Sequence, residues 1–263
     1  RCGAGKIYLI LLFAFASTVR AADAPSPPGG WDAPRLVDDA PGAYLPSIQT
    51  TEAGFAILYG RIEAGKPGVS TIRVYRITGD AKEISTPAEV AGFDGATIEI
   101  ARPESPPGAS SAADLWAWAE DGRRLFVGDS GRKTPLRETT NVILSDPTLA
   151  RAGAEMLVWA ERGGTTKLMF VERAGPGASW SAPRVFHEDI LCFFPRIAPV
   201  VRAGRRTFLV SWQEFRFGYW NILYSIYDPS SSSFTPPTIL TRNSSDNSSG
   251  ALFAGKSRTF SAW

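Results

Sequence analysis

A phrase of residues recurs along this chain, and it limits the possible folds more than any other feature. The phrase is a glycine, an apolar run, an aromatic residue, a small or polar residue and then a charge. The clearest copies are Gly153–Glu161 and Gly204–Glu214, and a third copy begins at Gly255. Weaker copies occupy residues 54–61 and 115–120. A repeat of about 50 residues that is typical of strands predicts an array of sheet units.

The spacing inside the repeat indicates what each unit contains. From Trp159 to Pro183 there are 24 residues, and from Trp212 to Pro236 there are also 24. Between these anchors lies a second strand-like run followed by a turn rich in Gly, Pro, Asp or Ser. A proline-led strand, at Pro147 or Pro195, opens the unit, so each unit has about four short strands.

Four antiparallel strands repeated in this way form the blade of a β-propeller, so the predicted fold is all-β. A β-sandwich is the alternative, but it would not need the same phrase at matched spacing. We expect blades centred on the aromatic residues of the phrase, namely Tyr59, Trp118, Trp159, Trp212 and Trp263.

The first and last segments suggest how the ring closes. Residues 31–37 copy residues 180–186, the last strand of a blade, and a lone outer strand of this kind is expected to complete the final blade. The copy that ends at Trp263 covers half a blade. The prediction is therefore a C-terminally truncated ring of four to five blades over residues 25–263, six-bladed when complete.

Composition limits the classes of partner. The 263 residues are 44% hydrophobic and 21% charged, which is ordinary for a globular domain. The net charge of +2 provides no broad electrostatic surface for nucleic acid. We expect no nucleic-acid partner, no cofactor and no metal.

The N-terminal segment is typical of an export signal. Arg1 and Lys6 precede an uncharged apolar stretch at residues 7–16, and small residues follow at two candidate cleavage points. This stretch is shorter than the roughly 20 residues that a membrane-spanning helix needs. We expect residues 1–24 to be a signal peptide and the domain to be exported to the periplasm or beyond. An uncleaved anchor is the alternative, and it would be the only membrane contact.

One cysteine, Cys192, would remain after cleavage, so no internal disulfide is expected. We interpret Cys192 as a small buried hydrophobe. The alternative, a catalytic thiol, would depend on His187, the single histidine of the chain.

The Trp-x-Glu strand ends and the segment Ser179–Pro183 resemble those of the sialidase-like (neuraminidase/BNR-repeat) β-propellers. The Asp-box of that family is degenerate here, because Arg173 and Gly175 stand where it has Ser and Asp. The resemblance implies an arginine triad for a substrate carboxylate, a tyrosine nucleophile beside a glutamate, and an acidic acid/base. The family's early arginine motif is matched only by the rearranged Phe194–Ile197, so the catalytic residues stay unassigned.

Residues that recur in every blade are best interpreted as structural, because a catalytic residue is needed only once. This applies to the tryptophans and to the glutamates that follow them. Less repetitive residues are better candidates for a ligand site. They are Arg196, Glu214, Arg216, Tyr219 and Trp220, of which the last four lie in an aromatic-rich insertion expected between two strands.

The leading hypothesis is an exported sialidase-like propeller that binds a glycan or another protein. The alternative is an exo-sialidase-type glycoside hydrolase with some catalytic residues outside this segment, and a third option is a scaffold without a ligand. The run His187–Asp189 is interpreted as a solvated loop, since three adjacent residues cannot all reach one ion. The sequons at Asn243 and Asn247 matter only in a eukaryotic secretory route.

Overall fold

The computed structural model describes residues 43–51, 54–62, 69–78, 88–94, 98–101, 103–104, 115–129, 132–241, 251–254 and 259–262. Within these ranges every regular element is a strand. The predicted signal segment, the outer-strand copy at residues 31–37, Trp263 and both sequons lie outside them. No helix long and apolar enough to cross a membrane occurs in the described ranges.

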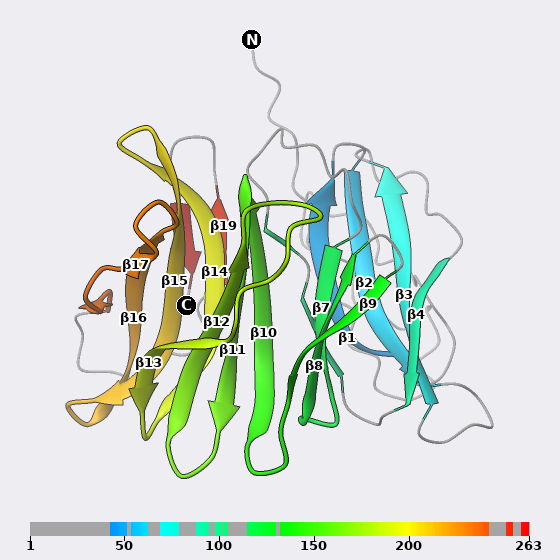
Figure 1. Cartoon of the computed structure of the whole chain (residues 1–263), viewed down its shortest axis with the longest axis horizontal. Coiled ribbons are helices and arrows are strands. Elements are labelled where there is room, and N and C mark those ends of the chain that lie inside the picture. Colours follow the sequence, from blue (N-terminus) through cyan, green and yellow to red (C-terminus); the bar gives the residue numbers. More distant parts are fainter. Residues whose placement is uncertain are drawn as a thin grey trace, which may run out of the picture.

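The strands form four sheets of four or five strands and one pair of strands (Figure 1). The first sheet is β1 (Ala43–Thr51), β2 (Gly54–Ile62), β3 (Val69–Thr78) and β4 (Ala88–Asp94). The second is β5 (Ile98–Ala101), β7 (Leu115–Glu120), β8 (Arg124–Asp129) and β9 (Arg132–Glu138). In both, sequential strands pair antiparallel.

The third and fourth sheets repeat this order. The third is β10 (Ile143–Ala152), β11 (Ala154–Arg162), β12 (Thr166–Arg173) and β13 (Arg184–Asp189), with the short β6 (Pro103–Glu104) added parallel to β10. The fourth is β14 (Cys192–Arg202), β15 (Arg205–Arg216) and β16 (Tyr219–Asp228), with an outer strand divided into β17 (Ser233–Phe234) and β18 (Thr238–Ile239). β19 (Ala251–Ala254) and β20 (Thr259–Ala262) pair alone.

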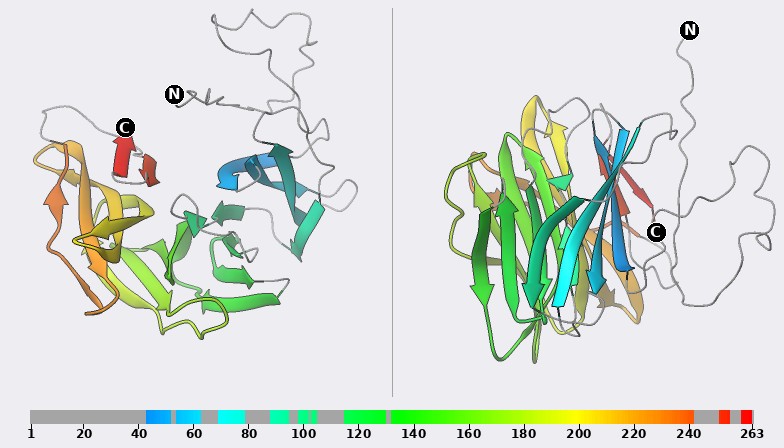
Figure 2. Two further views of the ribbon diagram at one scale, coloured as in Figure 1. Left: turned by 90° about the horizontal axis from the view of Figure 1, so that it is seen from above. Right: turned by 90° about the vertical axis from the view of Figure 1, so that its right-hand side faces the viewer.

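The sheets are the blades of a β-propeller, which confirms the predicted fold class. The first strands of successive blades, β1, β5, β10, β14 and β19, contact their neighbours in order. Seen from above, the blades fan around an open arc from β1 to β20 (Figure 2). The aromatic residues expected at the blade centres are on the second strand of each blade, at Tyr59, Trp118, Trp159 and Trp212.

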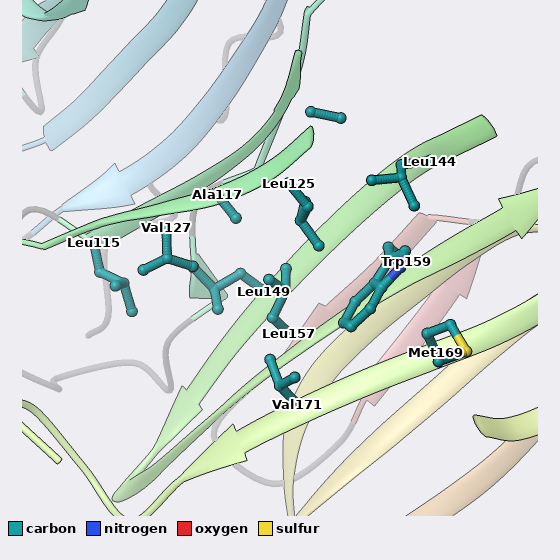
Figure 3. Packing of buried hydrophobic residues seen from close by; sticks show 11 residues of the cluster. Leu115, Ala117, Leu125, Val127, Leu144, Leu149, Leu157, Trp159, Met169 and Val171 are labelled. Atoms are coloured by element: carbon teal, nitrogen blue, oxygen red, sulfur yellow. The ribbon is translucent and has the colours of Figure 1, made fainter. Parts of the chain in front are cut away.

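Second strands are apolar because neighbouring blades cover both of their faces. In β11 every residue from Glu155 to Glu161 is buried. Trp159 lies in the core between the second and third blades, where it packs with Leu115, Leu125 and Met169 (Figure 3). Trp212 occupies the corresponding core between the third and fourth blades.

The Trp-x-Glu pairs of the repeat have the same geometry in three blades. The indole Nε1 donates to the carboxylate two residues later, at 3.0 Å for Trp118, 3.3 Å for Trp159 and 2.8 Å for Trp212. The accepting side chains, Glu120, Glu161 and Glu214, are buried. A buried carboxylate needs further donors, because burying an unpaired charge is costly.

Two of these glutamates are contacted by a basic side chain from the outer strand of the preceding blade. Arg137 Nε on β9 lies 2.8 Å from Glu161 Oε1, and His187 Nε2 on β13 lies 2.7 Å from Glu214 Oε2. Arg137 pairs across the sheet with Leu125 and His187 pairs with Leu168, so the two basic side chains occupy equivalent register positions. Glu120 instead receives Lys133 of its own blade. Glu161 and Glu214 therefore join adjacent blades, whereas Glu120 is held within its own blade.

The structure corrects three local predictions. Residues 187–189 are the end of strand β13 and are not a solvated loop. Strands β15 and β16 continue to Arg216 and Tyr219, so a tight turn at Phe217 and Gly218 replaces the expected insertion. The opening prolines lie inside their strands, because β10 begins at Ile143 and β14 at Cys192.

Candidate functional site

The inner strands of the third and fourth blades carry the same irregularity near their starts. The pairing register of β10 shifts between Ser145 and Thr148, and that of β14 shifts between Phe193 and Arg196. Each shift is a β-bulge that contains a proline, Pro147 or Pro195. Proline fits there because it has no N–H to give to the sheet.

The residue before each proline has a left-handed backbone. Asp146 and Phe194 both have φ of 53°. This conformation is uncommon for residues other than glycine, and a following proline further restricts its predecessor to extended backbone. Strained residues of this kind cost about 1–3 kcal/mol each and are found preferentially at functional sites. A register shift around a proline also occurs in β1, between Tyr44 and Ser47, so the bulge itself recurs with the blades, and the side chains that it places decide what this end can bind.

Side chains from both blades meet at this end. Arg162, the last residue of β11, donates from Nη2 to Asp146 Oδ2, and the Ser145 hydroxyl donates to the same oxygen at 2.9 Å. The Arg162 Cζ atom lies 5.1 Å from the ring centre of Phe193 and 5.6 Å from that of Phe194. The guanidinium thus bridges the third blade to the aromatic rings of the fourth.

The aromatic rings continue outward across the fourth blade. The ring centre of Trp220 lies 5.8 Å from that of Phe193 and 5.4 Å from that of Phe215. We call the set Phe193, Phe194, Phe215 and Trp220, together with Arg162 and Asp146, the aromatic cluster. Phe215 is 41% exposed, so the cluster reaches the surface.

The polar part of the cluster has unused donor capacity. Arg162 Nε is buried and has no hydrogen-bond partner in the described part of the chain. Buried polar groups are normally hydrogen-bonded, so the unpaired Nε is an exception inside the cluster. Aromatic rings and an arginine fork together suit a ligand that has an apolar face and several hydroxyl groups.

The ligand-site residues predicted from the sequence fall into two groups. Trp220 belongs to the aromatic cluster, and Tyr219 is next to it with 39% of its surface exposed. The other three have partners within the fold: Arg216 Nε pairs with Glu214, and Arg196 Nη1 donates to the carbonyl of Pro195 at 2.9 Å. Glu214 is fully buried in the blade interface.

The environment of Glu214 accounts for its protonation behaviour. Burial alone would raise the pKa of this carboxyl group. Hydrogen bonds from His187, Trp212 and Arg216 outweigh burial and lower the pKa to about 2. Glu214 is therefore a fixed anion at neutral pH, which suits the three hydrogen bonds that it accepts at the blade boundary.

Sequence reasoning missed Asp146, Arg162 and Phe194. The dipeptides Asp146-Pro147 and Phe194-Pro195 stand at matching places in two repeats and were the available signal. From the sequence, we interpret both prolines as strand starts and Phe194–Ile197 as a rearranged arginine motif. The contact of Arg162 with Phe193 and Phe194 joins two blades, and no local pattern contains it.

Cys192 is fully buried, and burial raises the pKa of its thiol to about 12. The thiol donates to the carbonyl of Thr166 at 3.4 Å. At neutral pH it therefore stays protonated, which makes it unsuited to nucleophilic catalysis.

A tyrosine beside a glutamate, as the sialidase resemblance implies, occurs between the third and fourth blades. The Tyr227 hydroxyl donates to Glu172 Oε1 at 2.5 Å, and Arg184 also contacts both residues. Tyr227 is fully buried, with its ring centre 5.4 Å from that of Phe170. Burial and the hydrogen bond to Glu172 raise the pKa of the phenol, so it stays neutral. This trio joins two blades and lacks the properties of a nucleophile.

The fold and this site define a β-propeller with an aromatic and charged cluster at one end of its inner strands. No protein-family model matches the chain. Among solved structures, it is similar to a GH43 protein from Bacillus licheniformis, at 12% identity and a TM-score of 0.45, over 76% of this chain and 43% of that one. The chain therefore spans less than half the length of that protein.

Two further solved structures are similar over larger shares of their length. One is the α-L-arabinofuranosidase of Podospora anserina in complex with cellotriose, at 9% identity and a TM-score of 0.46, over 81% of this chain and 77% of that one. The other is a GH62 hydrolase in complex with xylotriose, at 11% identity and a TM-score of 0.45, over 83% and 80% respectively.

Proposed function

We propose that this chain is a carbohydrate-binding β-propeller whose ligand lies on the aromatic cluster. One observation carries the proposal: the Arg162 guanidinium lies 5.1 Å from the ring centre of the half-buried Phe193, and the row of aromatic rings continues outward to the exposed Phe215. The C–H faces of a sugar ring pack against aromatic side chains, and its hydroxyl groups accept from a guanidinium. The positive charge of Arg162 is balanced by Asp146, so the cluster favours a neutral saccharide over a strongly anionic one.

The backbone also supports a binding role. The strained bulges hold Asp146 and Phe194 on neighbouring inner strands, and rigid elements position a binding group more precisely than loops do. A preorganised surface avoids part of the entropy cost of binding.

The direct test is a glycan-array screen of the chain, followed by calorimetry on the best oligosaccharide. The variant Trp220→Ala removes the central ring of the cluster and is expected to weaken binding at least tenfold, since buried aromatic anchors contribute about 2 kcal/mol or more. The control is Val201→Ala, an exposed apolar residue at the other end of β14. Equal affinity in the wild type and Trp220→Ala would refute the proposed site.

A second candidate function is glycoside hydrolysis, and Asp146 is the observation that favours it. A carboxylate on an inner strand, held by a strained bulge beside the cluster, could act on a bound sugar. Glycosidases generally use two carboxyl groups, and the described residues bring only Asp146 to the cluster. Binding therefore remains the preferred proposal, and export stays a prediction from residues 1–24.

Hydrolysis is tested with fluorogenic glycosides, including arabinofuranosides, xylosides and sialosides, in the wild type, Asp146→Asn and Arg196→Ala. Turnover abolished by Asp146→Asn would replace the binding proposal with an enzymatic one at the same cluster. Turnover of the sialoside alone, abolished by Arg196→Ala, would instead support the sialidase alternative. No turnover, with binding retained, supports the binding module.

A further inference from the structure

A second surface lies at the opposite end of the same blades, where the β10–β11 and β14–β15 turns are adjacent. A pocket of about 490 Å³ is lined there by Ala152, Ala154, Arg205, Arg206, Asp228, Pro229 and Ser230. In Figure 1 the β14–β15 hairpin is the yellow turn at the upper left. The register confirms the separation, because Arg202 pairs with Arg205 at this end of β14 and Cys192 pairs with Glu214 at the other.

The hairpin places like charges together. Arg202 and Arg205 are directly opposite each other across a turn in which Ala203 and Gly204 have φ of 49° and 75°. Like charges at opposed positions destabilise a hairpin. Among the described residues, the hairpin arginines form one ion pair, between Arg205 Nη1 and Asp228 Oδ2 at 3.9 Å. The arrangement therefore has an electrostatic cost that an anionic ligand would relieve.

Arg206 is the residue best placed for such a ligand. Its Nη1 would lie 3.3 Å from a Cβ added at Gly153, so the guanidinium rests on the turn of the neighbouring blade. Gly153 has φ of 89° and no side chain, which leaves room for this contact. Within the part of the chain that the structure describes, Arg206 has no carboxylate partner. The guanidinium is thus positioned and still available.

The charge around the pocket is positive beyond the hairpin. The next cross-strand pair in the third blade is Arg151 with Glu155, and Arg173 also pairs with Glu155. This end of the two blades thus has a net charge of +3 over seven residues. The five arginines are Arg151, Arg173, Arg202, Arg205 and Arg206, and the two carboxylates are Glu155 and Asp228. The Ser230 N–H and hydroxyl donate to Asp228 at 2.9 and 2.7 Å, which fixes the one carboxylate of the pocket lining.

We propose that this pocket binds an oxyanion, the carboxylate, sulfate or phosphate group of a ligand, through the guanidinium groups of Arg206 and Arg205. An arginine fork matches the oxygens of such a group with two parallel hydrogen bonds. The alanines and Pro229 offer an apolar wall to the rest of the ligand. The site is separate from the aromatic cluster, so its failure would leave the proposed carbohydrate site unaffected.

The test titrates the full chain with sulfate, phosphate and acetate in turn at constant ionic strength, with chloride as the reference. Binding is followed by calorimetry and by the Nε–H resonance of Arg206. We expect saturable binding of at least one oxyanion and at least a tenfold loss in Arg206→Gln, the size expected when a charge-assisted hydrogen bond is removed. Saturation by acetate alone would indicate a carboxylate ligand, and saturation by sulfate or phosphate a tetrahedral one.

The matched control is Arg202→Gln, which removes the same charge from the same hairpin without touching the pocket lining. It should change affinity less than twofold. A loss equal to that of Arg206→Gln, or a wild-type response no different from chloride, would overturn the proposal. If Arg206→Gln does not fold, Arg206→Lys keeps the charge and removes the fork, and unchanged affinity in that variant would overturn it equally.

Discussion

The role of the buried Glu214 carboxylate at the boundary of the third and fourth blades can be tested by replacing it with glutamine. The carboxylate accepts from Trp212 at 2.8 Å, from His187 at 2.7 Å and from Arg216. Glutamine keeps the shape but removes the charge, and it directs an NH₂ group toward one of these donors. The variant Glu214→Gln should therefore be less stable than the wild type at neutral pH.

The magnitude follows from the protonation of the carboxyl group. A pKa lowered from 4.5 to about 2 corresponds to about 3 kcal/mol of stabilisation at pH 7. A folded-state pKa below the unfolded value gives a contribution that is complete above about pH 5, because the carboxylate is then ionised in both states. It is lost as the pH falls through the unfolded value toward 2. The difference between variant and wild type should shrink over that window.

The assay is urea unfolding of both proteins at pH 7 and at steps down to the acid limit of folding. The control is Glu188→Gln, which changes an exposed glutamate on the neighbouring strand β13 and should cost less than about 0.5 kcal/mol. A loss below about 1 kcal/mol for Glu214→Gln at pH 7 would contradict the reasoning. A loss that stays constant between pH 7 and pH 3 would contradict it as well, because the effect would then not depend on the charge.

Three further predictions concern packing and reactivity. Gly128→Ala should lower the free energy of unfolding by about 3 kcal/mol, because the added Cβ would lie 2.1 Å from Trp116 Nε1, and urea unfolding measures this. Arg137→Ala should cost about 2 kcal/mol in the same assay, because it removes the cation that pairs with the buried Glu161; an unchanged midpoint would show that this pair does not stabilise the blade interface. Cys192 should react with iodoacetamide at pH 8 far more slowly in the native protein than in urea, as followed by mass spectrometry, and equal rates would contradict its burial.

The repeat predicted the blades well because its residues do the same physical task in each copy. Trp118, Trp159 and Trp212 fill equivalent places between blades, and each indole needs an acceptor, which the glutamate two residues later provides. Local spacing is enough to show such a unit. The turn at Phe217 and Gly218 was harder to predict, because an aromatic-rich stretch does not reveal where two strands stop pairing.

The candidate sites were predicted less well, and the physical reason is that each one joins residues from different blades. Arg162 and Phe194 are distant in sequence, and only the packing of the third blade on the fourth brings them together. The same is true of Arg206 and Gly153 at the other end.

By itself the sequence determined a propeller of four-stranded blades with aromatic residues at their centres, because hydrophobic periodicity and turn residues act over short distances. The tertiary structure decided which side chains face one another across the blade boundaries. It assigned Glu214 to an ion pair with Arg216 inside the protein, placed Arg162 against the aromatic rings of the next blade, and left Arg206 without a carboxylate partner among the described residues. Contacts between blades depend on how whole sheets pack, and no short segment of the chain contains that information.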